Sequence, residues 1–133
     1  MKALIIACFV YIILESLWLF LTKSFYTSLF ANFSKDGTLK IRSYIAIVIV
    51  YPLLLLGAWL LFLRNNYLSP LESFWKGALF GAIVYGVYNL TNMATLPGYS
   101  WKMVAVDTLW GVVVFSVFSV VYVQCKNYFL LHS

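Results

Sequence analysis

Two carboxylic acids, Glu15 and Asp107, occur inside long apolar stretches of this 133-residue sequence. An ionisable side chain within a membrane-spanning helix costs at least about 2.5–3.5 kcal/mol and by default marks a functional site. Glu15 is seven residues before Thr22 and Asp107 is six residues after Trp101, the two expected helix ends. At a rise of 1.5 Å per residue, both acids lie roughly 9–11 Å below the same surface. They are therefore predicted to share one layer, where they could bind a proton, a cation or a small polar solute.

Other polar side chains are predicted to reach this layer. In the third apolar stretch they follow spacings of three and four and form one helical face, and Tyr51 lies at comparable depth in the second. Glu15 belongs to a heptad-like seam with Cys8, Tyr11, Trp18 and Thr22, which directs it into the bundle. We predict neither a catalytic residue nor a metal site, and the predicted ligand- or proton-binding residues are Glu15, Asp107, Tyr85, Tyr88, Asn89, Asn92, Tyr51 and Trp110.

The composition indicates the elements that must position these residues. The chain is 64% hydrophobic and only 10% charged, whereas soluble domains are about a quarter charged. Four apolar runs are each long enough to cross a bilayer, which needs roughly 20 helical residues: 3–22, 44–63, 71–92 and 101–125. We therefore predict an all-α fold: one domain over residues 1–133, an integral membrane bundle of four transmembrane helices with both termini on the same side.

The net charge of +5 does not indicate nucleic acid binding, because the nine basic residues lie mostly at the expected helix ends. Such residues anchor to lipid head groups. Basic residues are balanced between the two sides of the predicted bundle, so the positive-inside rule gives no orientation. The lipid bilayer is the predicted partner, with a homo-oligomer or a larger membrane complex as further partners, and no cofactor is expected.

The connecting segments carry local signals. After the first span, aromatic and apolar residues recur at helical spacing: Phe25, Tyr26, Leu29, Phe30 and Phe33. This pattern predicts a short amphipathic helix in the membrane interface.

The segment Ser69-Pro70-Leu71-Glu72 is a capping box with proline at the first helical position. Pro97–Gly98 indicates a turn, after which Ser100 can cap the fourth helix. The pattern Gly77-x3-Gly81 predicts a close helix approach.

Two motifs carry a resemblance to a known family. The run Tyr85–Leu96 (YGVYNLTNMATL), followed by Asp107–Gly111 (DTLWG), resembles a domain-of-unknown-function family of small four-helix predicted membrane proteins with bacterial, algal and large-DNA-virus members. The likeness extends over most of the chain. It implies the fold and the motif but no activity. The family pattern usually has aspartate where this chain has Asn89.

Three functions remain open on the sequence. The first is a module that binds or conducts a proton, a cation or a small polar solute. The second is a structural or assembly subunit of a larger membrane or virion-membrane complex, without ligand chemistry. The third, an enzyme acting on a lipid head group, is disfavoured because there is no metal-ligand cluster and no nucleophile–base pair: the one histidine, His132, is in the tail, and Cys8 and Cys125 lie on the opposite side.

Overall fold

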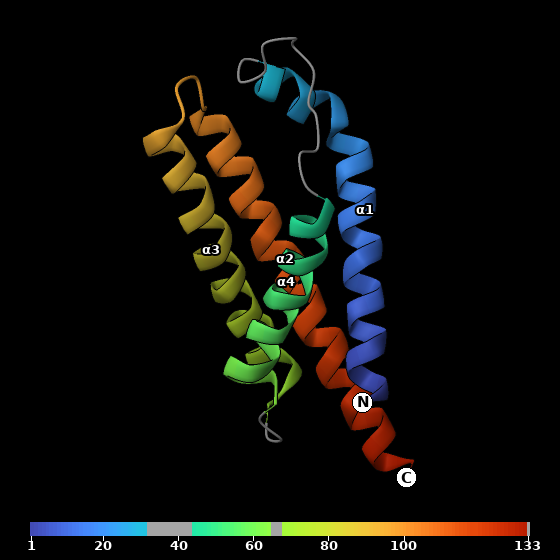
Figure 1. Ribbon diagram of the computed structural model, residues 1–133. Helices are drawn as coiled ribbons and strands as arrows, with labels where there is room; N and C mark the ends of the chain where they lie inside the picture. Colours follow the sequence, from blue (N-terminus) through green and yellow to red (C-terminus); the bar gives the residue numbers. More distant parts are fainter. Residues whose placement is uncertain (32–43, 65–67, 133) are drawn as a thin grey trace.

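The computed structural model describes residues 1–31, 44–64 and 68–132, and within these ranges the chain is helical with no strand. This confirms the all-α prediction. Figure 1 shows the arrangement of the helices. Their bounds are α1 Lys2–Phe30, α2 Tyr44–Ala58, the π-helix η2 Trp59–Leu63, α3 Pro70–Thr95 and α4 Trp101–Leu131. The helix α4 is central, because both α3 and α1 pack along it.

Two of the described helical segments, Lys2–Ser28 and Trp101–Leu131, are long and apolar enough to cross a membrane. Val48–Leu63 is a shorter apolar segment. The helix α3 has 26 residues but a more polar composition, with Glu72, Lys76 and its asparagines. Both chain termini lie at the same end of the bundle (Figure 1). Because only two of the described segments are clearly long and apolar enough to span a membrane, four crossings remain a prediction.

The end of α1 differs from the predicted separate interfacial helix. The helix continues without a break through Phe30, and its last turns bend over toward α4 (Figure 1). The Thr22 hydroxyl donates a hydrogen bond to the carbonyl of Trp18, four residues earlier, and this type of bond often bends helices. The predicted amphipathic segment is thus the bent end of α1, while Phe33 lies outside the described residues.

The start of α3 and the start of α4 confirm the predicted caps. At α3, the Ser69 hydroxyl accepts from the backbone N–H of Glu72 at 3.2 Å, and the Glu72 carboxylate accepts from the Ser69 N–H at 2.9 Å. At α4, Ser100 accepts from the Met103 N–H at 3.2 Å. Between the two helices Gly98 has a φ of 84°, which glycine adopts without steric cost. These local signals fix where each helix of the α3–α4 hairpin begins.

Glycines bring α3 and α4 into backbone contact. A side-chain carbon added at Gly81 would collide with the carbonyl of Gly111, and one added at Gly77 would collide with the carbonyl of Phe115. On α4, a side chain at Gly111 would collide with the ring of Tyr85. The close approach predicted from Gly77-x3-Gly81 is confirmed. It also fixes the register that places Tyr85 and Asn89 against α4.

Between the polar residues and the end of the bundle that contains both termini, aromatic rings fill the interior. Tyr11, Phe115 and Phe118 are fully buried, with ring centroids 5.4–6.2 Å apart. This core fills the half of the bundle that contains the termini. A smaller apolar cluster of Tyr99, Met103 and Val104 lies at the opposite end. The polar layer lies between these two apolar regions.

Candidate functional site

Glu15 projects from α1 into the bundle and is 7% exposed. Its Oε1 atom accepts a hydrogen bond from the Tyr85 hydroxyl of α3 at 2.7 Å and one from the Trp110 indole N–H of α4 at 3.2 Å. The Tyr11 hydroxyl lies 3.4 Å from that of Tyr85. One carboxylate oxygen thus joins three helices. Tyr11 is a third hydrogen-bonding neighbour of the Glu15 carboxyl group.

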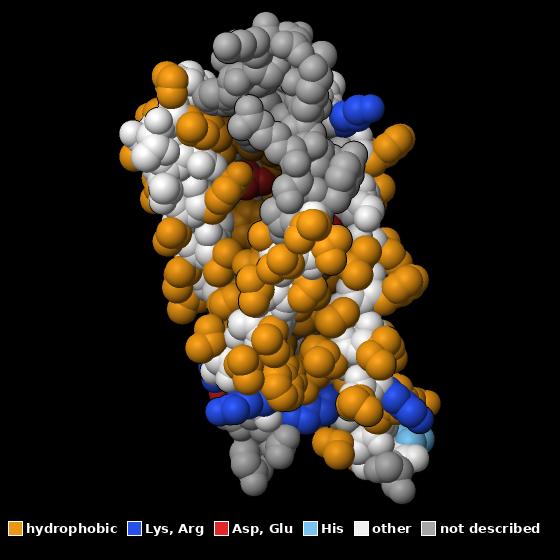
Figure 2. Space-filling model, viewed as in Figure 1, with side chains coloured by type: hydrophobic (Ala, Val, Ile, Leu, Met, Phe, Trp, Pro, Cys, Tyr) orange, Lys and Arg blue, Asp and Glu red, His pale blue; other side chains and the backbone are white. Residues whose placement is uncertain are grey.

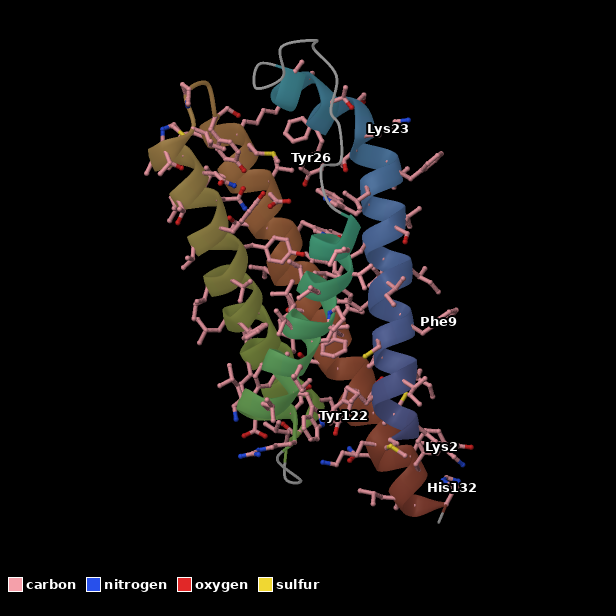
Figure 3. All side chains as sticks on the ribbon, viewed as in Figure 1. Lys2, Phe9, Lys23, Tyr26, Tyr122 and His132 are labelled. Atoms are coloured by element: carbon pink, nitrogen blue, oxygen red, sulfur yellow. The ribbon has the colours of Figure 1, made fainter. Side chains whose placement is uncertain are left out.

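Asp107 on α4 is 8% exposed and is held differently. Its Oδ1 accepts from the Tyr26 hydroxyl at 2.6 Å, and its Oδ2 accepts from the Asn89 amide at 2.7 Å. Both oxygens therefore face a donor. Tyr26 comes from the bent end of α1 and lies on its inner side, whereas Lys23 lies on its outer side (Figure 3).

The donors to Asp107 are themselves oriented. Asn89 is fully buried, and its carbonyl oxygen accepts from the Tyr99 hydroxyl at 2.6 Å, so its NH₂ group must face Asp107. The same NH₂ group also donates to the Tyr85 carbonyl at 2.8 Å. The Tyr26 hydroxyl accepts from the Trp18 indole N–H at 3.0 Å, so its own hydrogen is available to Asp107.

A pair of stacked indoles connects the two carboxylate networks. The rings of Trp18 and Trp110 are parallel within 2°, with centroids 4.5 Å apart. Trp110 donates to Glu15, and Trp18 donates to the hydroxyl that bonds Asp107. Within the described residues no hydrogen bond joins the two carboxylates directly. They are parts of one polar layer that connects α1, α3 and α4.

Five of the eight predicted site residues fall into this hydrogen-bonded group: Glu15, Asp107, Tyr85, Asn89 and Trp110. Tyr51 is half-buried, with its ring centroid 6.2 Å from that of Tyr11. Tyr88 is 56% exposed and turns away from the layer. Asn92 is half-buried near Tyr99. A ligand-binding role for these eight residues stays a prediction.

Four residues of the layer are absent from the site predicted from the sequence: Tyr11, Trp18, Tyr26 and Tyr99. Tyr11 and Trp18 lie on the seam that contains Glu15, and extending the assignment along that seam would have found them. Tyr26 was predicted to lie in the interface, because its segment followed the expected end of the first span. Tyr99 follows the Pro97–Gly98 turn, where no helical periodicity indicates its direction.

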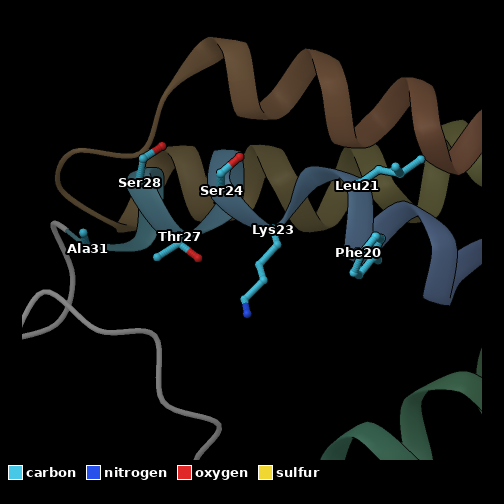
Figure 4. Close-up of a pocket in the computed structure, with 7 residues that line it drawn as sticks. All are labelled: Phe20, Leu21, Lys23, Ser24, Thr27, Ser28 and Ala31. Atoms are coloured by element: carbon cyan, nitrogen blue, oxygen red, sulfur yellow. The ribbon is translucent and has the colours of Figure 1, made fainter.

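The surface near the layer is hollowed. Figure 2 shows acidic atoms at the bottom of a recess in the upper half of the face viewed. A separate cavity of about 580 Å³ lies on the outer side of the α1 bend (Figure 4). It is lined by Phe20, Leu21, Lys23, Ser24, Thr27, Ser28 and Ala31 and contains none of the polar-layer residues. Acidic atoms are visible in the recess, and neither acid lines this cavity.

The donors around the acids restrict the chemistry of the layer. Among the described residues, the hydrogen bonds to Glu15 and Asp107 come from hydroxyl, indole and amide groups, and none comes from lysine, arginine or histidine. In the same part of the chain no group of three or more His, Cys, Asp or Glu side chains could hold a metal ion. Neutral donors around a carboxylate stabilise its charge without removing its ability to take a proton.

Removing the Tyr26 hydroxyl tests the link between the bent end of α1 and α4. In Tyr26→Phe, Asp107 and Trp18 each lose a partner, so we expect amide hydrogen exchange in residues 23–30 to become about tenfold faster, since a hydrogen bond to a charged group contributes roughly 1.5–3 kcal/mol. The exposed Tyr88→Phe is the matched control and should not change exchange. Equal exchange in both variants would contradict the link.

Comparison with known proteins places the chain in a family. No curated protein and no solved structure is significantly similar to it. The family model described as "Predicted membrane protein (DUF2177)" matches residues 1–123, which include both acids and every other residue of the polar layer. This confirms the resemblance drawn from the two motifs. The chain therefore belongs to the DUF2177 family of predicted membrane proteins.

Proposed function

We propose that this protein crosses a membrane four times and that its polar layer is a proton-binding site. Glu15 is the group that gains and loses the proton, and Asp107 is the acceptor beside it, with a donor at each oxygen. The observation that carries the proposal is the different hydrogen bonding of the two carboxylates: the Tyr85 and Trp110 bonds to Glu15 end on the same oxygen, whereas each oxygen of Asp107 faces its own donor.

Glu15 has the geometry of an exchangeable acid. A proton can be added at Oε2 while the Tyr85 and Trp110 bonds to Oε1 stay in place. The Tyr85 hydroxyl also lies beside that of Tyr11, and either oxygen of this pair can be the donor. Hydroxyl groups that can reverse their direction can pass a proton along. Protonation of Glu15 therefore requires little rearrangement.

Asp107 has the geometry of a permanent acceptor. A proton on either of its oxygens would oppose the Tyr26 or the Asn89 donor, at 2.6 and 2.7 Å. Neither donor can readily reverse, because Trp18 and Tyr99 orient them. The titratable groups facing Glu15 are Tyr11 and Tyr26 of α1, Tyr51 of α2, Tyr85 of α3 and Asp107 of α4. Of these, Asp107 is the only other carboxyl group.

The packing favours binding over conduction. Toward the terminal end, the fully buried rings of Tyr11, Phe115 and Phe118 close the bundle below Glu15. On the other side, the recess in Figure 2 reaches acidic atoms. A proton would therefore enter and leave through the same side of the layer.

Four crossings are supported by the surface of α3. Leu79, Ile83 and Val87 recur every four residues on its outer face and are 55–63% exposed, as expected for side chains that contact lipid. With 26 residues, α3 is about 39 Å long, more than the roughly 30 Å of a hydrocarbon core. Its polar residues of the layer, Tyr85 and Asn89, face α4.

Infrared spectroscopy of the protein in liposomes tests the proton site. The carboxylic acid C=O band reports protonated Glu or Asp, and we expect the wild type to show one pH-dependent band of the layer in addition to those of Asp36 and Glu72. It should be absent in Glu15→Gln and retained in Asp107→Asn. Glu72→Gln is the matched control, because Glu72 lies in the capping box, outside the layer.

The same set of titrating bands in the wild type and in Glu15→Gln would refute the assignment to Glu15. It would favour the alternative, a structural or assembly subunit whose polar layer only holds the helices together. That alternative also predicts that Glu15→Gln preserves all properties of the protein, since glutamine keeps an acceptor for Tyr85 and Trp110.

A further inference from the structure

A groove of about 550 Å³ lies at the end of the bundle that contains both termini, between the start of α1, the end of α4 and η2. Figure 3 shows Lys2, Tyr122 and His132 at this end. The groove combines basic and aromatic side chains, and those relevant here are Lys2, Lys126, His132, Trp59, Tyr122 and Phe129.

The charge of the groove is of one sign. Lys2, Lys126 and His132 contribute basic groups, and no acidic residue occurs among its described lining residues. The two ammonium groups lie over aromatic walls: Lys2 Nζ is 5.8 Å from the ring centroid of Phe129, and Lys126 Nζ is 5.8 Å from that of Tyr122. The groove therefore favours an anion.

The groove also has an apolar wall. The Trp59 indole donates to the Tyr122 hydroxyl at 3.2 Å, which fixes both rings, and Leu4 of α1 lines the same space. A ligand that satisfies both parts has an anionic head and an apolar tail. A free inorganic anion would use only the basic side chains.

We propose that this groove binds an anionic phospholipid, with the phosphate near Lys2, Lys126 and His132 and an acyl chain along Trp59 and Leu4. Basic pockets between membrane helices bind anionic lipid head groups. The proposal rests on the membrane placement proposed above but not on the proton site, which lies on the other side of the aromatic core.

The test measures which lipids remain bound after detergent extraction from vesicles of equal phosphatidylglycerol and phosphatidylcholine. By mass spectrometry we expect the wild type to retain phosphatidylglycerol preferentially. In the double variant Lys2→Gln/Lys126→Gln, retained phosphatidylglycerol should fall about tenfold. The control Arg64→Gln/Lys76→Gln removes the same charge outside the groove lining and should stay within about twofold of the wild type. The double variant Lys2→Arg/Lys126→Arg keeps the charge and should retain the lipid.

Three results would overturn the lipid site: equal retention in wild type and the Lys→Gln pair, an equal loss in the control pair, or loss in the Lys→Arg pair. Inorganic phosphate added during extraction should not displace the lipid, and displacement by it would indicate a site for free phosphate. The infrared band of Glu15 provides a separate readout. If lipid retention fails while that band titrates, only the lipid site is refuted, and the reverse result refutes only the proton site.

Discussion

Replacing Gly81 by alanine is expected to destabilise the bundle by about 3 kcal/mol, the upper end of the usual range for overpacking. The new methyl group would collide with the backbone carbonyl of Gly111, and a backbone cannot move aside as a side chain can. In an isolated helix the same change stabilises by up to about 1 kcal/mol, so the α3–α4 contact reverses the sign. The measurement is the midpoint of unfolding in detergent, followed by circular dichroism.

The matched control for this variant is Gly86→Ala on the same helix. Its new carbon would lie 3.8 Å from the Thr108 methyl group, an ordinary contact. We expect this variant to be as stable as the wild type or more stable. If both alanine variants unfold at the same midpoint, α3 and α4 do not approach as closely as the structure has them.

Replacing Asn89 by leucine is also expected to cost about 3 kcal/mol, because it leaves a buried carboxylate oxygen, Oδ2 of Asp107, without its donor. An unsatisfied buried polar group costs roughly 1–3 kcal/mol, and charged groups cost more. The same unfolding measurement applies.

Asn127→Leu is the control for the Asn89 variant, because Asn127 is an exposed residue of α4. It should not change the unfolding midpoint. An Asn89→Leu protein as stable as this control would show that the Asn89 amide does not bind Asp107.

The amide of Asn89 has a chemical meaning in this geometry. An aspartate at this position would bring two carboxyl groups to the distance now spanned by the 2.7 Å hydrogen bond. Two carboxylates at such a distance share a proton, whereas the amide supplies a donor to Asp107.

Local signals in the sequence were sufficient for the starts of α3 and α4 and for the contact between them, whereas the predicted spans 71–92 and 101–125 ended before Thr95 and Leu131. Ser69, Glu72 and Ser100 act on backbone groups within three residues, so their effects do not depend on the rest of the fold. The glycines Gly77 and Gly81 indicate a close approach by their lack of side chains. These features depend on residue type and spacing alone.

Features that depend on tertiary geometry could not be predicted to the same extent. A stripe at spacings of three and four includes Tyr85, Tyr88, Asn89 and Asn92. In the structure Tyr85 and Asn89 face α4, while Tyr88 is 56% exposed. Which of these residues face the bundle depends on the rotation of α3 about its axis, and the contact of its glycines with α4 fixes that rotation. Likewise, Tyr26 reaches Asp107 because α1 bends, which periodicity does not reveal.

The aromatic rings below Glu15 have an electrical consequence for the proposed proton site. Because Tyr11, Phe115 and Phe118 close the bundle on one side, a proton that reaches Glu15 travels only about 10 Å of a roughly 30 Å hydrocarbon core. It therefore crosses about a third of the transmembrane voltage, which corresponds to about 0.8 kcal/mol per 100 mV. Occupancy of Glu15 would then depend on membrane potential as well as on pH, and the orientation of the protein would decide whether polarisation loads the site or empties it.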